Sequence, residues 1–110
     1  MTVPDLTPAT MAKLTQVFAS YPDLTEVILF GSRATGRASE RSDIDLATLG
    51  IIDHNLLGRL ALDLEDMDIP QKCDLKAYES IRYAPLRAHI DSFGITIYKI
   101  RSNTPTSTEI

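Results

Sequence analysis

Two aspartates stand two positions apart inside an apolar segment, and this spacing can build a metal site. Asp43 and Asp45 alternate with Ile44 and Leu46. In a β-strand, side chains at i and i+2 share a face, so both carboxylates would project to one side while their aliphatic neighbours enter a core. Adjacent like charges repel, and a hard divalent cation between them removes that repulsion. We therefore predict that Asp43 and Asp45 bind Mg²⁺, which takes oxygen ligands and completes its shell with water and substrate phosphates.

The residues before this pair have the composition of an anion-binding turn. An apolar segment over residues 27–30 runs into Gly31 and Ser32, and a second glycine follows at Gly36. Glycine lets the backbone turn sharply and approach a ligand, while the serine offers a hydroxyl and an N–H to phosphate. A short helix over Arg33–Arg37 would add further donors at its N-terminus. Neither G-x-x-x-x-G-K-[ST] nor G-x-G-x-x-G is present, so the common nucleotide-binding loops are absent from the sequence.

The combined pattern G-S-x-x-x-G, a short spacer and S-D-x-D resembles the signature of the DNA polymerase β-type nucleotidyltransferases. The matching residues are Gly31, Ser32, Gly36, Ser42, Asp43 and Asp45. The small size also resembles the minimal nucleotidyltransferases (MNT), which are encoded beside HEPN-domain partners, and the resemblance spans roughly residues 10–100. It implies a third acidic residue on a later strand.

Asp74 fits the place of that third acidic residue. The segment 71–78 alternates, with Cys73, Leu75 and Ala77 on one face and Asp74 on the other. By the resemblance, Asp74 is a third metal ligand or the general base that activates the attacking hydroxyl, and one or two Mg²⁺ ions bridge the phosphates. Without the resemblance, an acidic residue on the polar face of a strand is equally typical of a solvent-facing position.

Basic and small polar residues around the turn are candidates for phosphate binding. Arginines at this site can form paired hydrogen bonds to phosphate oxygens, although solvated loop charges are the alternative interpretation. The phosphate-binding candidates are Gly31, Ser32, Arg33, Gly36, Arg41 and Ser42.

The rest of the chain predicts an α+β scaffold of one domain. Thr7 followed by Pro8 is typical of a helix start, and Asp53 can cap a second helix with an apolar stripe. The remaining predicted elements are a third helix over Tyr83 to His89 and a last strand over Ile95 to Ile100. These elements predict a small mixed sheet with helices on one face and the carboxylates on the other, over residues 1–100. The Ser/Thr/Pro-rich tail 101–110 is predicted to be disordered.

Composition favours a small cytoplasmic enzyme or binding domain. Among 110 residues, Lys and Arg number 11 and Asp and Glu 15, a net charge of −4, which disfavours nucleic-acid binding by bulk charge. The single cysteine, Cys73, has no partner for a disulfide or zinc and is expected in the core. No segment resembles a membrane span or a signal peptide. His54 and His89 stand at no spacing typical of metal ligation.

The resemblance to the minimal family also implies a partner. It predicts an antitoxin that transfers AMP from ATP to a tyrosine of a HEPN ribonuclease toxin, in a hetero-oligomer with that toxin. Two alternatives stay open: an antitoxin that acts by binding alone, and a free-standing transferase of a small hydroxyl-bearing substrate.

Overall fold

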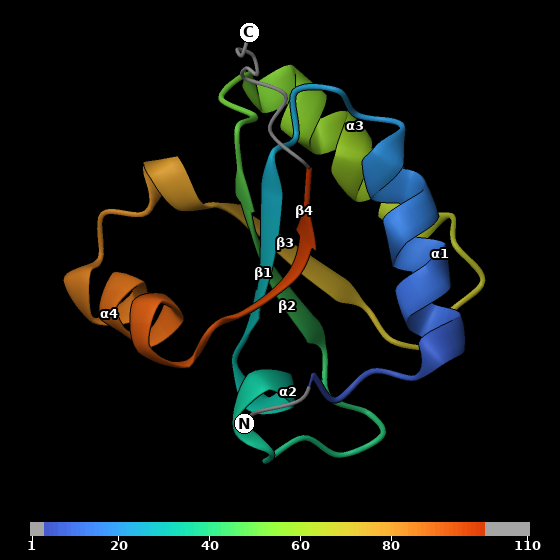
Figure 1. The fold of residues 1–110 in the computed structure, drawn as a ribbon, viewed down its shortest axis with the longest axis vertical. Coiled ribbons are helices and arrows are strands. Elements are labelled where there is room, and N and C mark those ends of the chain that lie inside the picture. Colours follow the sequence, from blue (N-terminus) through green and yellow to red (C-terminus); the bar gives the residue numbers. More distant parts are fainter. Residues whose placement is uncertain (1–3, 101–110) are drawn as a thin grey trace, which may run out of the picture.

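A four-stranded mixed sheet forms the frame of the protein. The computed structural model describes residues 4–100, and the strand order is β3-β2-β1-β4. β1 (Glu26–Phe30) is antiparallel to β2 (Ile44–Leu49) and β4 (Ile95–Lys99), whereas β3 (Cys73–Ala77) runs parallel to β2 (Figure 1). The α+β class predicted from the sequence is confirmed. The predicted tail, 101–110, lies outside the described residues.

Two helices start where the sequence predicts capping side chains. α1 (Pro8–Ala19) is capped by Thr7, whose hydroxyl oxygen accepts the N–H of Thr10 at 3.1 Å. α3 (His54–Glu65) is capped by Asp53, whose carboxylate accepts the N–H of Asn55 at 2.9 Å. Each cap satisfies a backbone donor that the first helical turn leaves without an intrahelical partner.

The larger core lies between these helices and one face of the sheet. Its fully buried side chains include Leu14 and Phe18 from α1, Leu60 from α3, and Leu29, Ile44 and Leu46 from the strands. Because side chains alternate along a strand, burying Ile44 and Leu46 on this face directs Asp43 and Asp45 to the opposite face. The hydrophobic pattern thus sets the orientation of the carboxylates.

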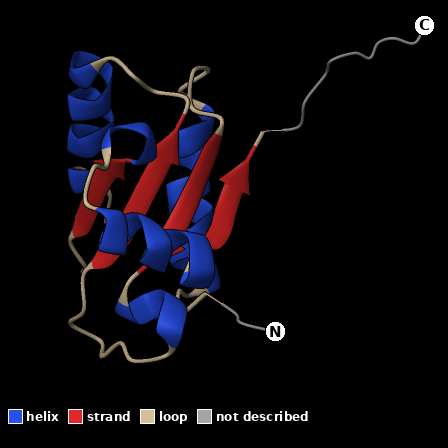
Figure 2. Ribbon diagram, turned by 90° about the vertical axis from the view of Figure 1, so that its left-hand side faces the viewer, coloured by secondary structure: helices blue, strands red, loops and turns tan. Residues whose placement is uncertain are grey.

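A fourth helix packs on the face that carries the carboxylates. α4 (Ala84–Phe93) contributes Ile90 to a smaller core with Phe30, Ala47 and Ile81. The sequence predicted helices on one face only and a helix ending at His89, whereas Figure 2 shows helices on both sides of the strands. The physical reason is that Phe30 and Ala47 leave an apolar area beside Asp45 that water would otherwise contact.

Two short helices follow the ends of strands. α2 (Ser32–Thr35) comes directly after β1, and the 3-10 helix η1 (Tyr78–Ser80) directly after β3. Within residues 4–100, no helix has the length and apolar character needed to cross a bilayer.

Candidate active site

The three predicted carboxylates come together at one end of the sheet. Asp45 and Asp74 are register partners on the parallel strands β2 and β3, and Asp43 stands one residue before β2. Asp43 and Asp45 share a face, since they lie two positions apart. Asp43 is exposed, and Asp45 and Asp74 are partly buried. The fold therefore collects three negative charges beside the chain segment where β1 ends.

The Asp45 carboxylate is the most perturbed of the three. Burial raises its pKa above the usual value of 3.8, and the negative charges of Asp74 and Asp43 raise it further. Lys76 acts in the opposite direction, and its Nζ lies 3.9 Å from Asp74 Oδ2. Two like charges oppose the ionised form of a partly buried acid, and a bound cation would remove that opposition.

These residues fit Mg²⁺ as partial ligands. Within residues 4–100, no three His, Cys, Asp or Glu side chains are arranged to enclose a metal by themselves. Mg²⁺ in phosphoryl-transfer sites characteristically uses one or two carboxylates and takes its remaining ligands from phosphates and water. The donors are hard oxygens, and the Asp45 carboxylate lies against the turn because residue 31 has no side chain. A Cβ built there would lie 2.3 Å from Asp45 Oδ2.

The turn after β1 requires glycine at two positions. Gly31 has φ 75° and ψ −152°, and Gly36 ends α2 in the left-handed conformation with φ 80°. Between them, the N–H groups of Ala34 and Thr35 donate to the Gly31 carbonyl at 3.1 and 3.2 Å. The predicted helix over Arg33–Arg37 is thus a single turn that begins one residue earlier, at Ser32. Residues 37–43 then form the loop that leads from Gly36 to β2.

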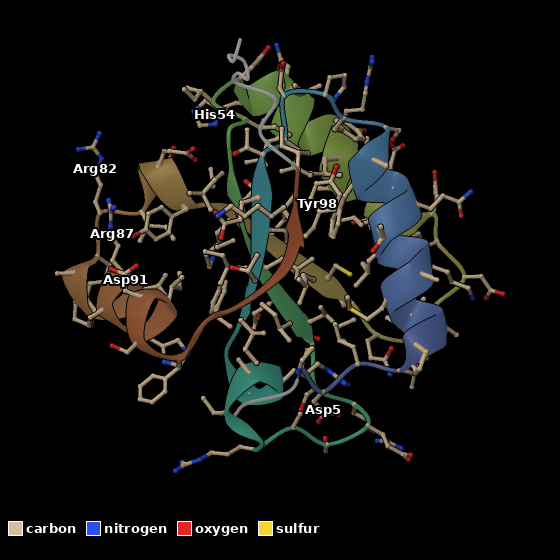
Figure 3. The ribbon with its side chains drawn as sticks, in the orientation of Figure 1. Asp5, His54, Arg82, Arg87, Asp91 and Tyr98 are labelled. Carbon is tan, nitrogen blue, oxygen red and sulfur yellow. The ribbon has the colours of Figure 1, made fainter. Side chains whose placement is uncertain are left out.

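Arg33 has a different task from the phosphate contact that the sequence suggested. Its side chain is 6% exposed, and its guanidinium donates to the Ser42 carbonyl at 3.0 and 3.1 Å and to the Asp5 carbonyl at 2.9 Å. Further bonds reach the carbonyls of Ser39 and Glu40 at 3.2 and 3.4 Å. Figure 3 shows Asp5 beside α2 and this loop. Arg33 therefore fixes the loop before Asp43, and its guanidinium is occupied by backbone carbonyls and is not free to contact a phosphate.

The other loop candidates lie nearer to solvent. Ser42 Oγ accepts the N–H of Ser39 at 2.9 Å, which closes the turn immediately before Asp43. Arg41 is exposed, and its N–H donates to Ser39 Oγ at 3.3 Å. Arg37, whose charge the sequence allows to be either a phosphate contact or a solvated loop charge, lines a pocket together with Ser32. Of the three arginines in this stretch, Arg37 and Arg41 are the exposed ones.

His89 was not predicted to belong to the site, yet it contacts the turn directly. Its Nε2 accepts the N–H of Gly31 at 3.1 Å, so this nitrogen carries no proton in the observed arrangement. The imidazole lies edge-on to Phe30, with ring centroids 6.2 Å apart. No sequence signal could have found this contact, because the partner is a backbone N–H group 58 residues away.

Side-chain contacts hold α4 over this face of the sheet. Tyr78 donates its hydroxyl to Asp91 Oδ1 at 2.6 Å, and the Arg87 guanidinium lies 4.5 Å from the centre of the Tyr78 ring. Figure 3 shows Arg87 and Asp91 on α4 beside η1. A hydrogen bond to a carboxylate and a cation–π contact together fix the helix to the end of β3. His89 is held in position by the same helix.

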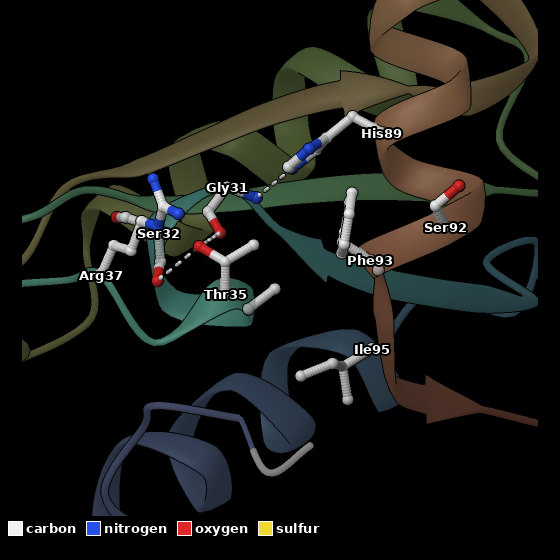
Figure 4. A pocket seen from close by; sticks show the side chains of 10 residues that line it. Gly31, Ser32, Thr35, Arg37, His89, Ser92, Phe93 and Ile95 are labelled. Atoms are coloured by element: carbon white, nitrogen blue, oxygen red, sulfur yellow. Dashed lines mark hydrogen bonds between the residues drawn. The ribbon is translucent and has the colours of Figure 1, made fainter. Parts of the chain in front are cut away.

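A pocket of about 760 Å³ opens beside the turn. α2 and its flanking glycine supply one wall, with Gly31, Ser32, Thr35 and Arg37. The end of α4 and the start of β4 supply the other, with His89, Ser92, Phe93 and Ile95 (Figure 4). This size is typical of sites for cofactors and small molecules.

Comparisons with known proteins agree with this arrangement. The family model "Polymerase beta, Nucleotidyltransferase" matches residues 12–103. A structure of a toxin–antitoxin with AMP-PNP contains a chain that is 25% identical, with a TM-score of 0.66, covering 83% of this chain and 74% of that one. A structure of a MntA-HpeT toxin–antitoxin mutant gives 26% identity and a TM-score of 0.61, covering 87% and 75%.

A third similar structure resembles the chain in fold. It is the rebuilt and re-refined structure of the tri-AMPylated Shewanella oneidensis HEPN toxin in complex with MNT antitoxin. The matching chain is 23% identical with a TM-score of 0.54, covering 82% of this chain and 70% of that one. No curated protein sequence matches the chain significantly.

Proposed function

Because the chain belongs to the polymerase beta nucleotidyltransferase family, we propose that it is an antitoxin that transfers AMP from ATP, with Mg²⁺, to a tyrosine of a HEPN-domain toxin. The observation that carries this proposal is the register that sets Asp45 beside Asp74, next to the turn at Gly31. This register supports transfer chemistry because it places carboxylates from two strands beside a turn. At that turn, residue 31 has no side chain that would displace the Asp45 carboxylate. Fold alone would not support an activity.

Asp43 and Asp45 are the residues that would hold Mg²⁺, with Asp74 adjacent. When bound, Mg²⁺ would supply positive charge that stabilises the negative charge on the phosphates during transfer. Ser32, Arg37, Arg41 and the turn glycines would orient the triphosphate. Repulsion among the three carboxylates, which raises the pKa of Asp45, would be relieved by the cation.

Asp74 is suited to receive a proton from the acceptor. Its side chain is 45% exposed and faces the same side of the sheet as Asp45, so an incoming hydroxyl can reach it. In the proposed step, the hydroxyl oxygen forms a bond to the α-phosphorus while the bond from that phosphorus to the oxygen bridging to the β-phosphate breaks. Pyrophosphate leaves, and the hydroxyl proton passes to Asp74.

The solved structures similar to this chain support a toxin as the acceptor. One is a toxin–antitoxin with AMP-PNP, and another contains a tri-AMPylated HEPN toxin with MNT antitoxin. An AMP group adds negative charge and bulk to a tyrosine, and this would repel RNA from a ribonuclease site.

The test is transfer of label from [α-³²P]ATP, with Mg²⁺, to the product of the gene adjacent to the one that encodes this chain, as the candidate HEPN-domain acceptor. We expect labelled partner with α-labelled ATP and none with γ-labelled ATP, because pyrophosphate is the leaving group. Asp45→Asn should reduce labelling by at least about 100-fold, the scale on which loss of electrostatic stabilisation acts. Asp66→Asn, which changes an exposed carboxylate at the end of α3, is the matched control and should label normally.

The same assay separates the alternatives. A toxin that is neutralised by Asp45→Asn without any label would support masking by binding and contradict the enzymatic proposal. Label on a small molecule in the absence of any partner would instead support a free-standing transferase.

A further inference from the structure

The pocket beside α2 has two ends of different chemistry. Toward the turn lie the hydroxyls of Ser32 and Thr35 and the guanidinium of Arg37. Toward β4 lie Phe93 and Ile95, and Figure 4 shows them across the pocket from Thr35. A nucleotide has the same division, since its phosphates are anionic and its base is flat and largely apolar on its faces.

Phe93 is a large aromatic residue whose side chain is mostly exposed to solvent. The side chain is 57% exposed at the last position of α4, and its nearest aromatic partner is His89, with ring centroids 5.5 Å apart. Because Phe93 also lines the pocket, its exposed ring is placed to contact a ligand bound there. An aromatic face is also a stacking surface that accepts a base of any sequence.

His89 joins the aromatic end of the pocket to the turn. Its Nε2 accepts the N–H of Gly31 at 3.1 Å on one side, and its ring packs against Phe93 on the other. The turn at Gly31 in turn lies against the Asp45 carboxylate, because a Cβ built on Gly31 would lie only 2.3 Å from Asp45 Oδ2. The His89 imidazole therefore lies between the exposed phenyl ring of Phe93 and the turn beside the carboxylates. A single nucleotide is long enough to extend from that ring to the turn.

We propose that this pocket holds the nucleoside part of the donor nucleotide, with the base stacked on Phe93 and the phosphates directed toward Ser32 and the carboxylates. The inference rests on the proposed function, because it assumes a nucleotide as donor. It goes further in assigning the base to the wall formed by α4 and β4, and in making Phe93 a determinant of nucleotide affinity. A segment of the acceptor protein is the competing occupant.

Calorimetric titration with two ligands tests the assignment. MgATP carries a base, whereas magnesium tripolyphosphate presents only the phosphates. Phe93→Ala should weaken MgATP binding by about 5- to 100-fold, the effect of losing one stacked aromatic face, and leave tripolyphosphate within about twofold of wild type. Phe93→Leu keeps apolar volume without the flat face and should behave like Phe93→Ala, while Phe93→Tyr should retain MgATP affinity.

Tyr83→Ala is the matched control, because Tyr83 is a 70% exposed aromatic residue at the other end of α4 and outside the pocket. It should bind both ligands like wild type. Equal MgATP affinity in wild type and Phe93→Ala would overturn the inference, and so would parallel weakening of both ligands. Normal MgATP affinity with reduced transfer to the toxin would also overturn it, in favour of the acceptor. If wild type binds neither ligand, the proposed function itself fails.

Discussion

A series of three glycine-to-alanine variants tests whether the turn and Asp45 form one unit. Gly31 combines a positive φ of 75° with a Cβ position only 2.3 Å from Asp45 Oδ2. Gly36 has a φ of 80° but open space around its Cβ position, and Gly58, inside α3, has open space and does not have a positive φ. The three positions therefore separate backbone strain from the clash with the carboxylate.

The expected costs follow from these differences. Gly31→Ala forces a conformation reserved for glycine, at about 1–3 kcal/mol, and displaces the Asp45 side chain from its rotamer at about 0.5–1.5 kcal/mol. Gly36→Ala carries the left-handed backbone cost alone, about 1–2 kcal/mol. Gly58→Ala should stabilise the protein by up to about 1 kcal/mol, because alanine favours a helix interior over glycine.

Urea unfolding monitored by circular dichroism measures these free energies. Gly31→Ala should lose about 2–4 kcal/mol, which corresponds to a fall in Tm of at least about 8 °C for a domain of this size. In an Asp45→Ala background, the same substitution should cost about 1 kcal/mol less, since the clash is gone while the backbone strain stays. A cost for Gly31→Ala no larger than that for Gly36→Ala, or no coupling to Asp45, would refute the close approach of the turn to the carboxylate.

Three further outcomes are expected. Asp45→Asn should raise the Tm of the metal-free and nucleotide-free protein at pH 7. Folding raises the pKa of the Asp45 carboxyl above 3.8, so the ionised carboxylate destabilises the folded state. This destabilisation grows as the pH rises from the unfolded-state pKa through the higher folded-state pKa. Thermal melts in EDTA should show the gain vanishing below about pH 3.8, and a gain that instead grew toward low pH would contradict this explanation. Arg33→Ala should lose roughly 2–4 kcal/mol in urea unfolding, because buried carbonyls lose a charged donor, whereas Arg37→Ala, at an exposed position, should stay within about 0.5 kcal/mol of wild type. Burial raises the pKa of the Cys73 thiol to about 11 from 9.0, so its alkylation by iodoacetamide at pH 8 should be about 100-fold slower in the folded protein than in urea; equal rates would place the thiol in water.

The local signals of the sequence were sufficient for most of the fold. The capping residues Thr7 and Asp53 start their helices as predicted, and the alternation around Asp45 correctly assigned one face of β2 to the core. The family resemblance inferred from the Gly-Ser turn and the aspartate pair is confirmed by the match over residues 12–103. Caps and alternation are read within a few residues, so they do not depend on the rest of the chain.

Other parts of the site depend on distant neighbours. From the sequence, Arg33 is a candidate for phosphate binding, and only its burial against the carbonyls of Asp5 and Ser42 assigns it to the loop. His89 looked like an ordinary helical residue until α4 brought it to the Gly31 N–H. A guanidinium or an imidazole can serve a backbone group or a ligand equally well, and its neighbours decide which.

The sequence by itself determined the chemistry that this protein can offer, because residue types and their spacing of two along a strand fix which carboxylates share a face and where glycine permits a turn. The tertiary structure alone decided which groups surround that chemistry. The parallel register of β2 and β3 sets Asp74 beside Asp45, and the packing of α4 on Phe30 and Ala47 places His89 and Phe93 at the turn. These contacts join segments far apart in the chain, and burial of apolar surface, which has no direction along the sequence, holds them together.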